Sequence, residues 1–326
     1  CAPCAAFRGL GVLAGHTESV AAGLSRDGRV AVGWGRPGSD APSQALRWEL
    51  ASGQVEALSD SPYSRAIGVN ADGSVVVGYT EISDAQRDAY RWTRDAGWAL
   101  ISTNASALKV SADGNSVVGV HPLGTLFEAF RWTPSAGLVG LNSPFGLLAS
   151  QALGISPDGA LVLGQATSEA GNLQAVTWGA AGLQKLGGFP TETGTSYASA
   201  SNADGSVLVG INGSRQALPA VFLWTPAGPV RLALGALSDS PPSTNLAGSV
   251  VVGTSRARAF VWEQRTGKAQ PLHRAWGDLV PAGWLLLEAT DVSEDGRVIV
   301  GSGRSPEHEL EAWVGVLGPQ CTGAEP

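Results

Sequence analysis

The sequence predicts an all-β fold, a seven-bladed β-propeller built from four-stranded blades, and three observations lead to this prediction. The first is an internal repeat of about 40 to 50 residues, which is the period of propeller blades. The second is the content of 44 Gly in 326 residues, about twice the usual share of roughly 7%, which indicates many turns. The third is a hydrophobic fraction of 44%, which excludes a disordered chain because it provides ample apolar surface to bury.

Each repeat begins with an Asp-Gly pair or its equivalent. The pairs are Asp27-Gly28, Asp72-Gly73, Asp113-Gly114, Asp158-Gly159, Asp204-Gly205 and Asp295-Gly296, with Ala247-Gly248 in the remaining place. Their glycines follow one another at intervals of 45, 41, 45, 46, 43 and 48 residues. Asp-Gly between two apolar runs predicts a hairpin with a type I′ turn, in which both central residues have positive φ.

An apolar strand that ends in Gly follows each pair, and an Ala-x-x-Trp motif comes about ten residues later. Ser74-Val75-Val76-Val77-Gly78 is one such strand, and its continuous apolar character suits a sheet covered on both faces. The motif tryptophans are Trp48, Trp92, Trp132, Trp178, Trp224 and Trp262, whereas Trp313 of the last repeat is displaced by two positions. We expect these rings to pack between blades, and the neighbouring Arg47, Arg91 and Arg131 to form structural salt bridges or stacking contacts.

The two ends of the chain predict how the ring closes. The last repeat stops after Ala312-Trp313-Val314 and lacks its fourth strand, while Gly9 to Leu13 match Gly137 to Leu141. We therefore expect residues 7–13 to complete the last blade. The predicted organisation is an anchor segment at residues 1–6, one propeller domain at residues 7–321 and a tail at residues 322–326.

The repeats also resemble a known family. Leu10-Gly11-Val12-Leu13-Ala14-Gly15, Ala22 to Gly28 and Val30 to Gly33 are similar to the HAF-repeat extracellular propeller proteins of bacteria, and Glu128 to Trp132 and Arg258 to Trp262 look like the motif that names the family. The resemblance spans residues 7–316. It implies secretion or surface display without an established general activity. The motif's His is replaced here by Gln44, Asp88, Glu128, Gln174 and Arg258, so any role of that His is lost.

The three cysteines, Cys1, Cys4 and Cys321, lie at the extremes of the chain. Ring closure brings the ends together, which predicts a Cys4–Cys321 disulfide and an oxidising, extracytoplasmic compartment. A chain that starts with Cys resembles a processed bacterial lipoprotein with its lipid on Cys1, anchored to the outer membrane, and the absence of Met agrees with such processing. Two alternatives stay open, a Cys1–Cys321 pairing and a Cys1-x-x-Cys4 redox or metal motif.

No catalytic constellation, cofactor motif or metal site emerges from the sequence. The net charge of −7 disfavours nucleic-acid partners. Glu307-His308-Glu309 suits a solvated loop better than a metal site. Aromatic residues on the variable loops suit protein or carbohydrate recognition, unless some of them fold inward and fill the channel. These candidates are Trp34, Tyr63, Phe145, Phe189, Tyr197, Trp276 and Trp284.

We therefore expect a non-enzymatic propeller of the cell envelope or cell surface that mediates protein–protein interaction or assembly. One alternative is a carbohydrate-binding or adhesive module that uses the loop aromatics. A second is a polysaccharide hydrolase or lyase with its site over the channel. The expected partners are other envelope or surface proteins, or glycans, and the membrane through a lipid on Cys1.

Overall fold

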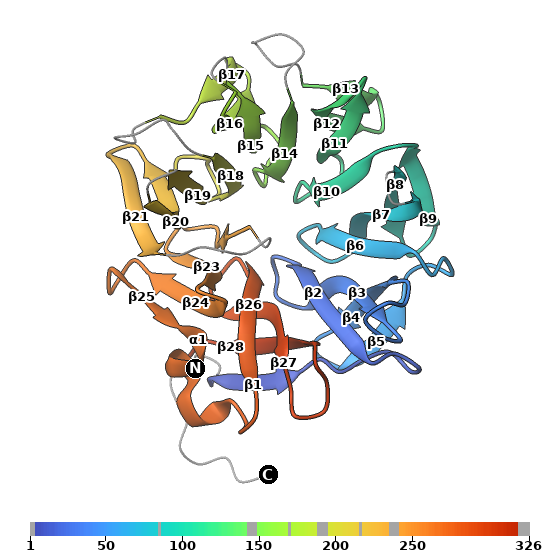
Figure 1. Cartoon of the computed structure of the whole chain (residues 1–326), viewed down its shortest axis with the longest axis vertical. Helices are drawn as coiled ribbons and strands as arrows, with labels where there is room; N and C mark the ends of the chain where they lie inside the picture. Colours follow the sequence, from blue (N-terminus) through green and yellow to red (C-terminus); the bar gives the residue numbers. More distant parts are fainter. Residues whose placement is uncertain are drawn as a thin grey trace.

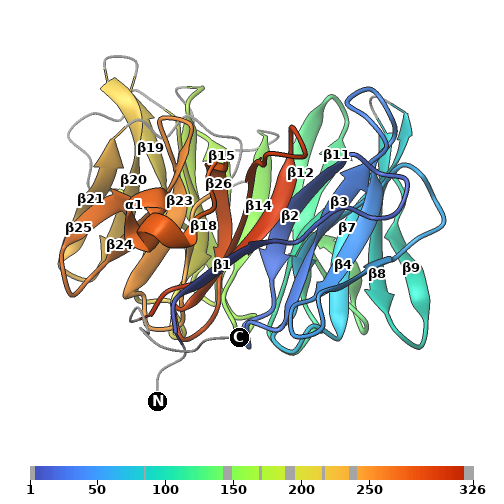
Figure 2. The ribbon, with the colours of Figure 1, turned by 90° about the horizontal axis from the view of Figure 1, so that it is seen from below.

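Seven four-stranded antiparallel sheets surround a central axis in the computed structural model, and this arrangement confirms the predicted seven-bladed β-propeller (Figure 1). The structure describes residues 4–83, 86–141, 149–168, 171–187, 195–214, 217–234 and 241–318. Viewed at right angles, the strands run between the two faces of the ring (Figure 2). None of the helices in these ranges is both long enough and apolar enough to cross a membrane.

The first four blades follow one another along the chain, each running from its inner strand outward. Blade 1 contains β2 (Glu18–Leu24), β3 (Val30–Arg36), β4 (Gln44–Glu49) and β5 (Gln54–Ala57). Blade 2 contains β6 (Ser64–Val69), β7 (Val75–Ser83), β8 (Gln86–Thr93) and β9 (Gly97–Ser102). Blade 3 contains β10 (Ser106–Val110), β11 (Val117–Leu123), β12 (Leu126–Thr133) and β13 (Gly137–Gly140). Blade 4 contains β14 (Ser150–Ile155), β15 (Val162–Thr167), β16 (Leu173–Gly179) and β17 (Gly182–Lys185).

The remaining three blades include the one that closes the ring. Blade 5 contains β18 (Ser196–Ser201), β19 (Leu208–Ser214), β20 (Ala217–Thr225) and β21 (Gly228–Leu234). Blade 6 contains β22 (Ser243–Thr244), β23 (Val250–Ser255), β24 (Arg258–Glu263) and β25 (Lys268–Pro271). Helix α1 (Leu272–Trp276) and the 3-10 helix η1 (Gly277–Leu279) lead to blade 7, which contains β26 (Leu285–Val292), β27 (Val298–Arg304), β28 (Glu311–Val316) and β1 (Ala6–Gly9).

The Asp-Gly turns differ from the predicted type I′ geometry. In blade 1 the Gly28 N–H donates to the Ser25 carbonyl at 2.9 Å, and Gly28 alone has a positive φ, of 72°. Asp27 stays outside the left-handed region because its side chain holds the turn instead, accepting bonds from the Ser25 hydroxyl at 2.6 Å and the Arg29 N–H at 3.1 Å. The prediction of positive φ at both residues is therefore wrong, although the hairpin itself is confirmed.

The second strand does not end at its Gly as predicted, since β3 continues past Gly33 to Arg36, and this Gly is instead required by a close approach between strands. The register of β2 and β3 shifts between Ala21 and Gly23, which is a β-bulge in the innermost strand. A Cβ on Gly33 of β3 would overlap the Val20 carbonyl oxygen. The same overlap, with the inner strand of its own blade, would occur at Gly78, Gly119, Gly164, Gly210 and Gly301.

Tryptophan packing between blades is confirmed. The described residues form seven apolar clusters in the core, and each combines residues of two neighbouring blades. Trp48, for example, is fully buried against Val300 and Ala312 of the preceding blade. Arg47 beside it forms the predicted salt bridges, to Glu49 at 3.2 Å and to Glu56 at 3.1 Å.

The N-terminal strand closes the ring as predicted, but it is shorter and its register differs. β1 pairs antiparallel with β28 and ends at Gly9, which lies opposite Trp313. Leu10 then donates its N–H to Ala312, as Leu141 does to Ala129. Leu10 is therefore the counterpart of Leu141, and the expected match of residues 9–13 with 137–141 is displaced by three positions.

Blade 7 replaces its displaced motif tryptophan with one from outside the sheet. Gly315 pairs with Ile299, which is the strand position that Trp48 holds opposite Ala31 in blade 1. A Cβ on Gly315 would overlap the ring of Trp276, which comes from α1 and donates its indole N–H to the Val316 carbonyl at 3.0 Å. Trp276 therefore fills the place between blades 6 and 7 that a motif tryptophan fills elsewhere.

Candidate functional site

The inner strands of all seven blades line a central channel of about 570 Å³. Trp34 at the end of β3 and Arg65 of β6 both contribute to its lining. They come from strand ends that lead to the loops between second and third strands and to the connections between blades. We call the face that carries these loops the upper face, and the face with the Asp-Gly turns the turn face.

The channel lining contains charges of both signs. Three cations, Arg26, Arg65 and Lys109, share the channel wall with Glu288 and Asp291. Burial lowers the pKa of Arg26, whereas the carboxylates of Asp291 and Glu294 act in the opposite direction.

Asp291 is held in place by neighbours on three blades. Its carboxylate accepts hydrogen bonds from the Ser243 hydroxyl at 2.7 Å, from the Leu24 N–H at 3.0 Å and from the Val292 N–H at 2.9 Å. Because these donors come from blades 6, 1 and 7, Asp291 joins the inner strands around the closure of the ring. Its hydrogen bonds indicate a structural role for this carboxylate.

Arginines stack on Trp34 at the upper end of the channel. The Arg65 guanidinium carbon lies 4.8 Å from the Trp34 ring centroid, and that of Arg36 lies 5.4 Å from it. Arg36 is held by Glu18 at 2.6 Å, and the Arg65 Nε donates to the Ser43 hydroxyl at 3.1 Å. The indole and both guanidinium groups are therefore held in fixed positions before any partner arrives.

The same network continues across blade 2. Glu81 lies 3.6 Å from Arg65 and 3.7 Å from Arg87, so it bridges the two arginines. Arg87 in turn covers the ring of Tyr79 at 4.7 Å. We call the chain of contacts from Arg36 and Trp34 through Arg65, Glu81 and Arg87 to Tyr79 the arginine–aromatic network.

A groove of about 310 Å³ lies next to the network on the upper face. Arg87 lines it on one side, and Pro122 and Phe127 of blade 3 line it on another. Large apolar side chains, Phe127 of the groove lining among them, are exposed at the ends of the second and third strands of blades 2 and 3 on the same face. They are Ile82 at 53%, Leu123 at 39% and Phe127 at 51%, with Tyr63 at 50% on the connection to blade 2. Aromatic and Arg side chains of this kind dominate the binding energy of protein interfaces.

The structure separates the aromatic candidates predicted from sequence. Trp34 belongs to the network and Tyr63 is half-exposed beside it. Tyr197 packs against the apolar cluster between blades 5 and 6. Phe145 and Phe189 lie outside the described residues.

The prediction that Trp276 is available to a ligand is wrong. Its side chain is 1% exposed and lies 5.6 Å from Trp313 and 5.7 Å from Phe7, between ring centroids. Trp284 packs edge-on against Phe7 at 5.2 Å. Trp276 and Trp284 come from the longest connection between blades, and they pack where the N-terminal strand closes the ring. Packing at this closure is the physical reason why the connection carries these aromatic side chains.

The network's arginines and the exposed Phe127 were not predicted from sequence. Arg36, Arg65 and Arg87 belong to no repeated motif, so only their positions near strand ends distinguish them. The exposed apolar residues offered a clearer signal, because Leu123 and Phe127 flank a Gly124-Thr125 hairpin tip where polar residues are usual.

The histidines and cysteines form no cluster in the parts of the chain that the structure describes. His121 pairs with Glu128 at 3.2 Å, and burial lowers the pKa of His16. Nowhere in these parts do three His, Cys, Asp or Glu side chains gather so as to hold a metal. Cys4 is disulfide-bonded, but Cys1 and Cys321 lie outside the described residues, so the Cys4–Cys321 pairing and the lipid on Cys1 stay predictions.

Comparison with solved structures shows the fold alone. The β-propeller domain of the Trilobed protease from Pyrococcus furiosus is 9% identical with a TM-score of 0.62, over 91% of this chain and 95% of that one. An oligogalacturonate lyase solved in complex with manganese is 13% identical with a TM-score of 0.58, over 93% of this chain and 90% of that one.

TolB from Acinetobacter baumannii is 13% identical with a TM-score of 0.56, over 75% of this chain. The match spans 63% of the TolB chain's length. No family model matches the sequence, and no curated protein does. The fold is thus shared by a domain of a protease, a lyase and TolB, so the site itself must indicate the function.

Proposed function

We propose that this protein is a non-enzymatic propeller of the cell envelope that binds other proteins through the upper face of blades 1 to 3. The arginine–aromatic network is the observation that carries this proposal. It offers a tryptophan and two stacked arginines whose rotamers are already fixed, which reduces the entropy lost on binding. The exposed apolar residues next to it, Leu123 and Phe127 among them, supply area for burial in an interface.

The envelope location rests on the sequence. The resemblance to the HAF-repeat extracellular proteins suits a protein outside the cytoplasm, and the proposed lipid attachment site is Cys1. Two or more acyl chains would hold such a protein stably at a membrane, whereas a single chain would not. Membership of the HAF-repeat family and the lipid anchor are both part of this proposal.

The test compares native complexes of the wild type with those of an upper-face variant in the source cells. Arg65→Glu reverses the charge that stacks on Trp34 and pairs with Glu81. We expect it to release the protein from large complexes on native gels, because the new carboxylate repels Glu81 and the Trp34 ring keeps only its contact with Arg36. Arg29→Glu, on the exposed turn face, makes the same change in charge and should leave the complexes intact.

Two results would contradict the proposal. One is that complexes persist unchanged in Arg65→Glu. The other is that the purified wild type turns over a polysaccharide in a broad screen, with activity lost in Trp34→Ala. The second result would favour the hydrolase or lyase alternative over a protein-binding role.

A further inference from the structure

A second groove lies on the outer side of the ring, between blades 5 and 6. It has a volume of about 670 Å³ and runs along β21, β24 and β25. Four basic side chains line it, Arg231, Arg256, Arg258 and Lys268. Asp and Glu are absent from the described residues that line it, although the whole chain carries a net charge of −7. The lining of the groove is therefore positively charged, whereas the protein as a whole is negatively charged.

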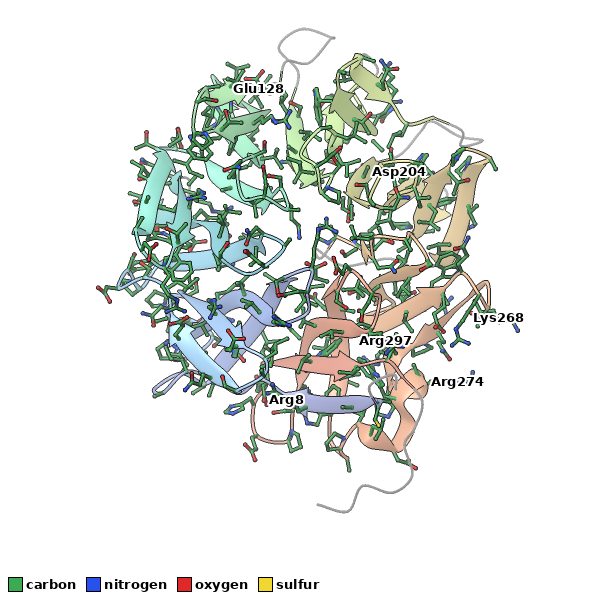
Figure 3. All side chains as sticks on the ribbon, turned by 180° about the vertical axis from the view of Figure 1, so that it is seen from behind. Arg8, Glu128, Asp204, Lys268, Arg274 and Arg297 are labelled. Carbon is green, nitrogen blue, oxygen red and sulfur yellow. The ribbon has the colours of Figure 1, made fainter. Side chains whose placement is uncertain are left out.

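None of the four cations has an acidic partner within 4.0 Å in the described ranges. Arg265, on the turn between β24 and β25, does have one, since it pairs with Glu263 at 2.9 Å. Arg256, Arg258 and Lys268 are exposed. In Figure 3, Lys268 lies at the outer rim of blade 6, with Arg274 of α1 on the same side.

The hairpin tip brings two of these cations close together. Arg256 and Ala257 form the turn between β23 and β24, with φ of 52° and 55°. Both angles lie in the left-handed region, which Gly or Asn would occupy more easily. The chain thus holds Arg256 near Arg258 in a costly conformation, and among the described residues neither forms an ion pair with a carboxylate.

The floor between the cations is apolar. Phe260 is 3% exposed, and Leu232 and Ala269 are half-buried beside it. The neutral polar side chains of the lining are Ser255 and Gln270. A sugar chain would need more hydroxyl partners and an exposed aromatic platform, and a phosphate chain would gain nothing from the apolar floor. A peptide with alternating carboxylates and apolar side chains matches both the walls and the floor.

We propose that this groove binds an extended acidic segment of a partner polypeptide. Carboxylates of the segment would pair with Arg256, Arg258, Arg231 and Lys268, and its apolar side chains would cover Phe260 and Leu232. Arg guanidinium groups form bidentate hydrogen bonds with carboxylates, which attract the segment and also fix its position along the groove. This site lies away from the arginine–aromatic network and does not depend on the function proposed for it.

The test measures binding of short fluorescent peptides to the full chain by fluorescence anisotropy. A peptide of alternating Glu and Leu should bind, and its affinity should fall as salt is raised. The same peptide with Gln in place of Glu should bind far more weakly. The double variant Arg256→Glu, Arg258→Glu should weaken binding of the acidic peptide by about tenfold or more, because two charge-assisted hydrogen-bonded pairs are lost.

The control is the double variant Arg29→Glu, Arg304→Glu, which makes the same change in net charge on exposed residues of blades 1 and 7. Equal weakening in the control and in the groove variant would overturn the proposal. Tighter binding of polygalacturonate or of phosphatidylglycerol vesicles, in competition with the peptide, would also overturn it. Arg65→Glu should leave peptide binding unchanged, which separates this proposal from the upper-face function.

Discussion

At the scale of single residues, Trp276 shows how the closing blade differs from the other six. Its ring occupies the space that Gly315 leaves in β28, and its N–H bonds the Val316 carbonyl at 3.0 Å. Aromatic contacts to Phe7 and Trp313 complete the cluster. One buried side chain from a helix thus completes the set of inter-blade tryptophans.

We therefore predict that Trp276→Ala lowers the free energy of unfolding by about 3 to 5 kcal/mol, the usual cost of a large aromatic cavity. Trp34→Ala should cost only about 1 kcal/mol, because Trp34 lies at the rim and loses mainly its contacts with two arginines. Urea denaturation of both variants measures the difference. Similar losses in the two variants would show that Trp276 does not have this role in the core.

Sequence could predict the motif tryptophans but not this replacement. The repeated Ala-x-x-Trp spacing indicates burial because the same position returns in each blade. Trp276 stands outside that spacing, in a connection where a loop aromatic is more often exposed. Only the space left by the missing side chain of Gly315 identifies its partner, and the two residues are 39 positions apart in the sequence.

At the scale of elements, side chains hold the Asp-Gly turns. The Asp113 carboxylate accepts a hydrogen bond from the Asn115 N–H at 3.0 Å and another from the Ser111 hydroxyl. The Ser111 hydroxyl bond, followed by the Asn115 N–H bond, lowers the pKa of Asp113. The pKa of Asp158 is lowered in the same way, mainly by the hydrogen bond from the Ser156 hydroxyl and then by that from the Ala160 N–H. Both ionised carboxylates therefore stabilise their hairpins.

These shifts predict how stability depends on pH. A pKa that is lower in the folded chain contributes stability above the unfolded value of about 3.9, and this contribution is lost as pH falls through the folded pKa. The double variant Asp113→Asn, Asp158→Asn should thus be less stable than the wild type at pH 7, and the gap should narrow below about pH 4. Urea midpoints at several pH values test this.

The exposed Asp40 provides the control, since Asp40→Asn should change stability little at any of these pH values. A gap between the double variant and the wild type that stays constant down to pH 3 would contradict the account. In that case the hairpins would depend on the shape of the Asp side chain and not on its charge.

The sequence predicts that the N-terminal strand closes the ring, but it does not predict the register in which β1 pairs with β28. The last repeat contains one strand fewer than the others, which indicates that the N-terminus supplies the missing strand. The short segment from Gly9 to Leu13 offers two glycines and two leucines to align, so more than one register fits by sequence. The bond from Leu10 to Ala312 selects between them.

At the scale of the whole molecule, the two faces of the ring carry different structural features. Turns on one face join neighbouring blades through backbone bonds, as from Asp27 to Ala71 at 3.2 Å and from Glu294 to Arg26 at 2.8 Å. The upper face carries the channel end, the arginine–aromatic network and the exposed apolar side chains. The Asp-Gly turns of one face repeat from blade to blade, but the residues that distinguish the upper face vary.

The central claim is that the upper face of blades 1 to 3 is a protein-binding surface. The most direct measurement places a photo-crosslinking amino acid at one position at a time in the source cells. Tyr63 and Phe127 sample the upper face, and the exposed Ala96 and Ser135 sample the turn face of blades 2 and 3. We predict discrete protein adducts from Tyr63 and Phe127 that disappear with Arg65→Glu, and none from the other two. Adducts that form equally from both faces, or only from Ala96 and Ser135, would contradict the claim.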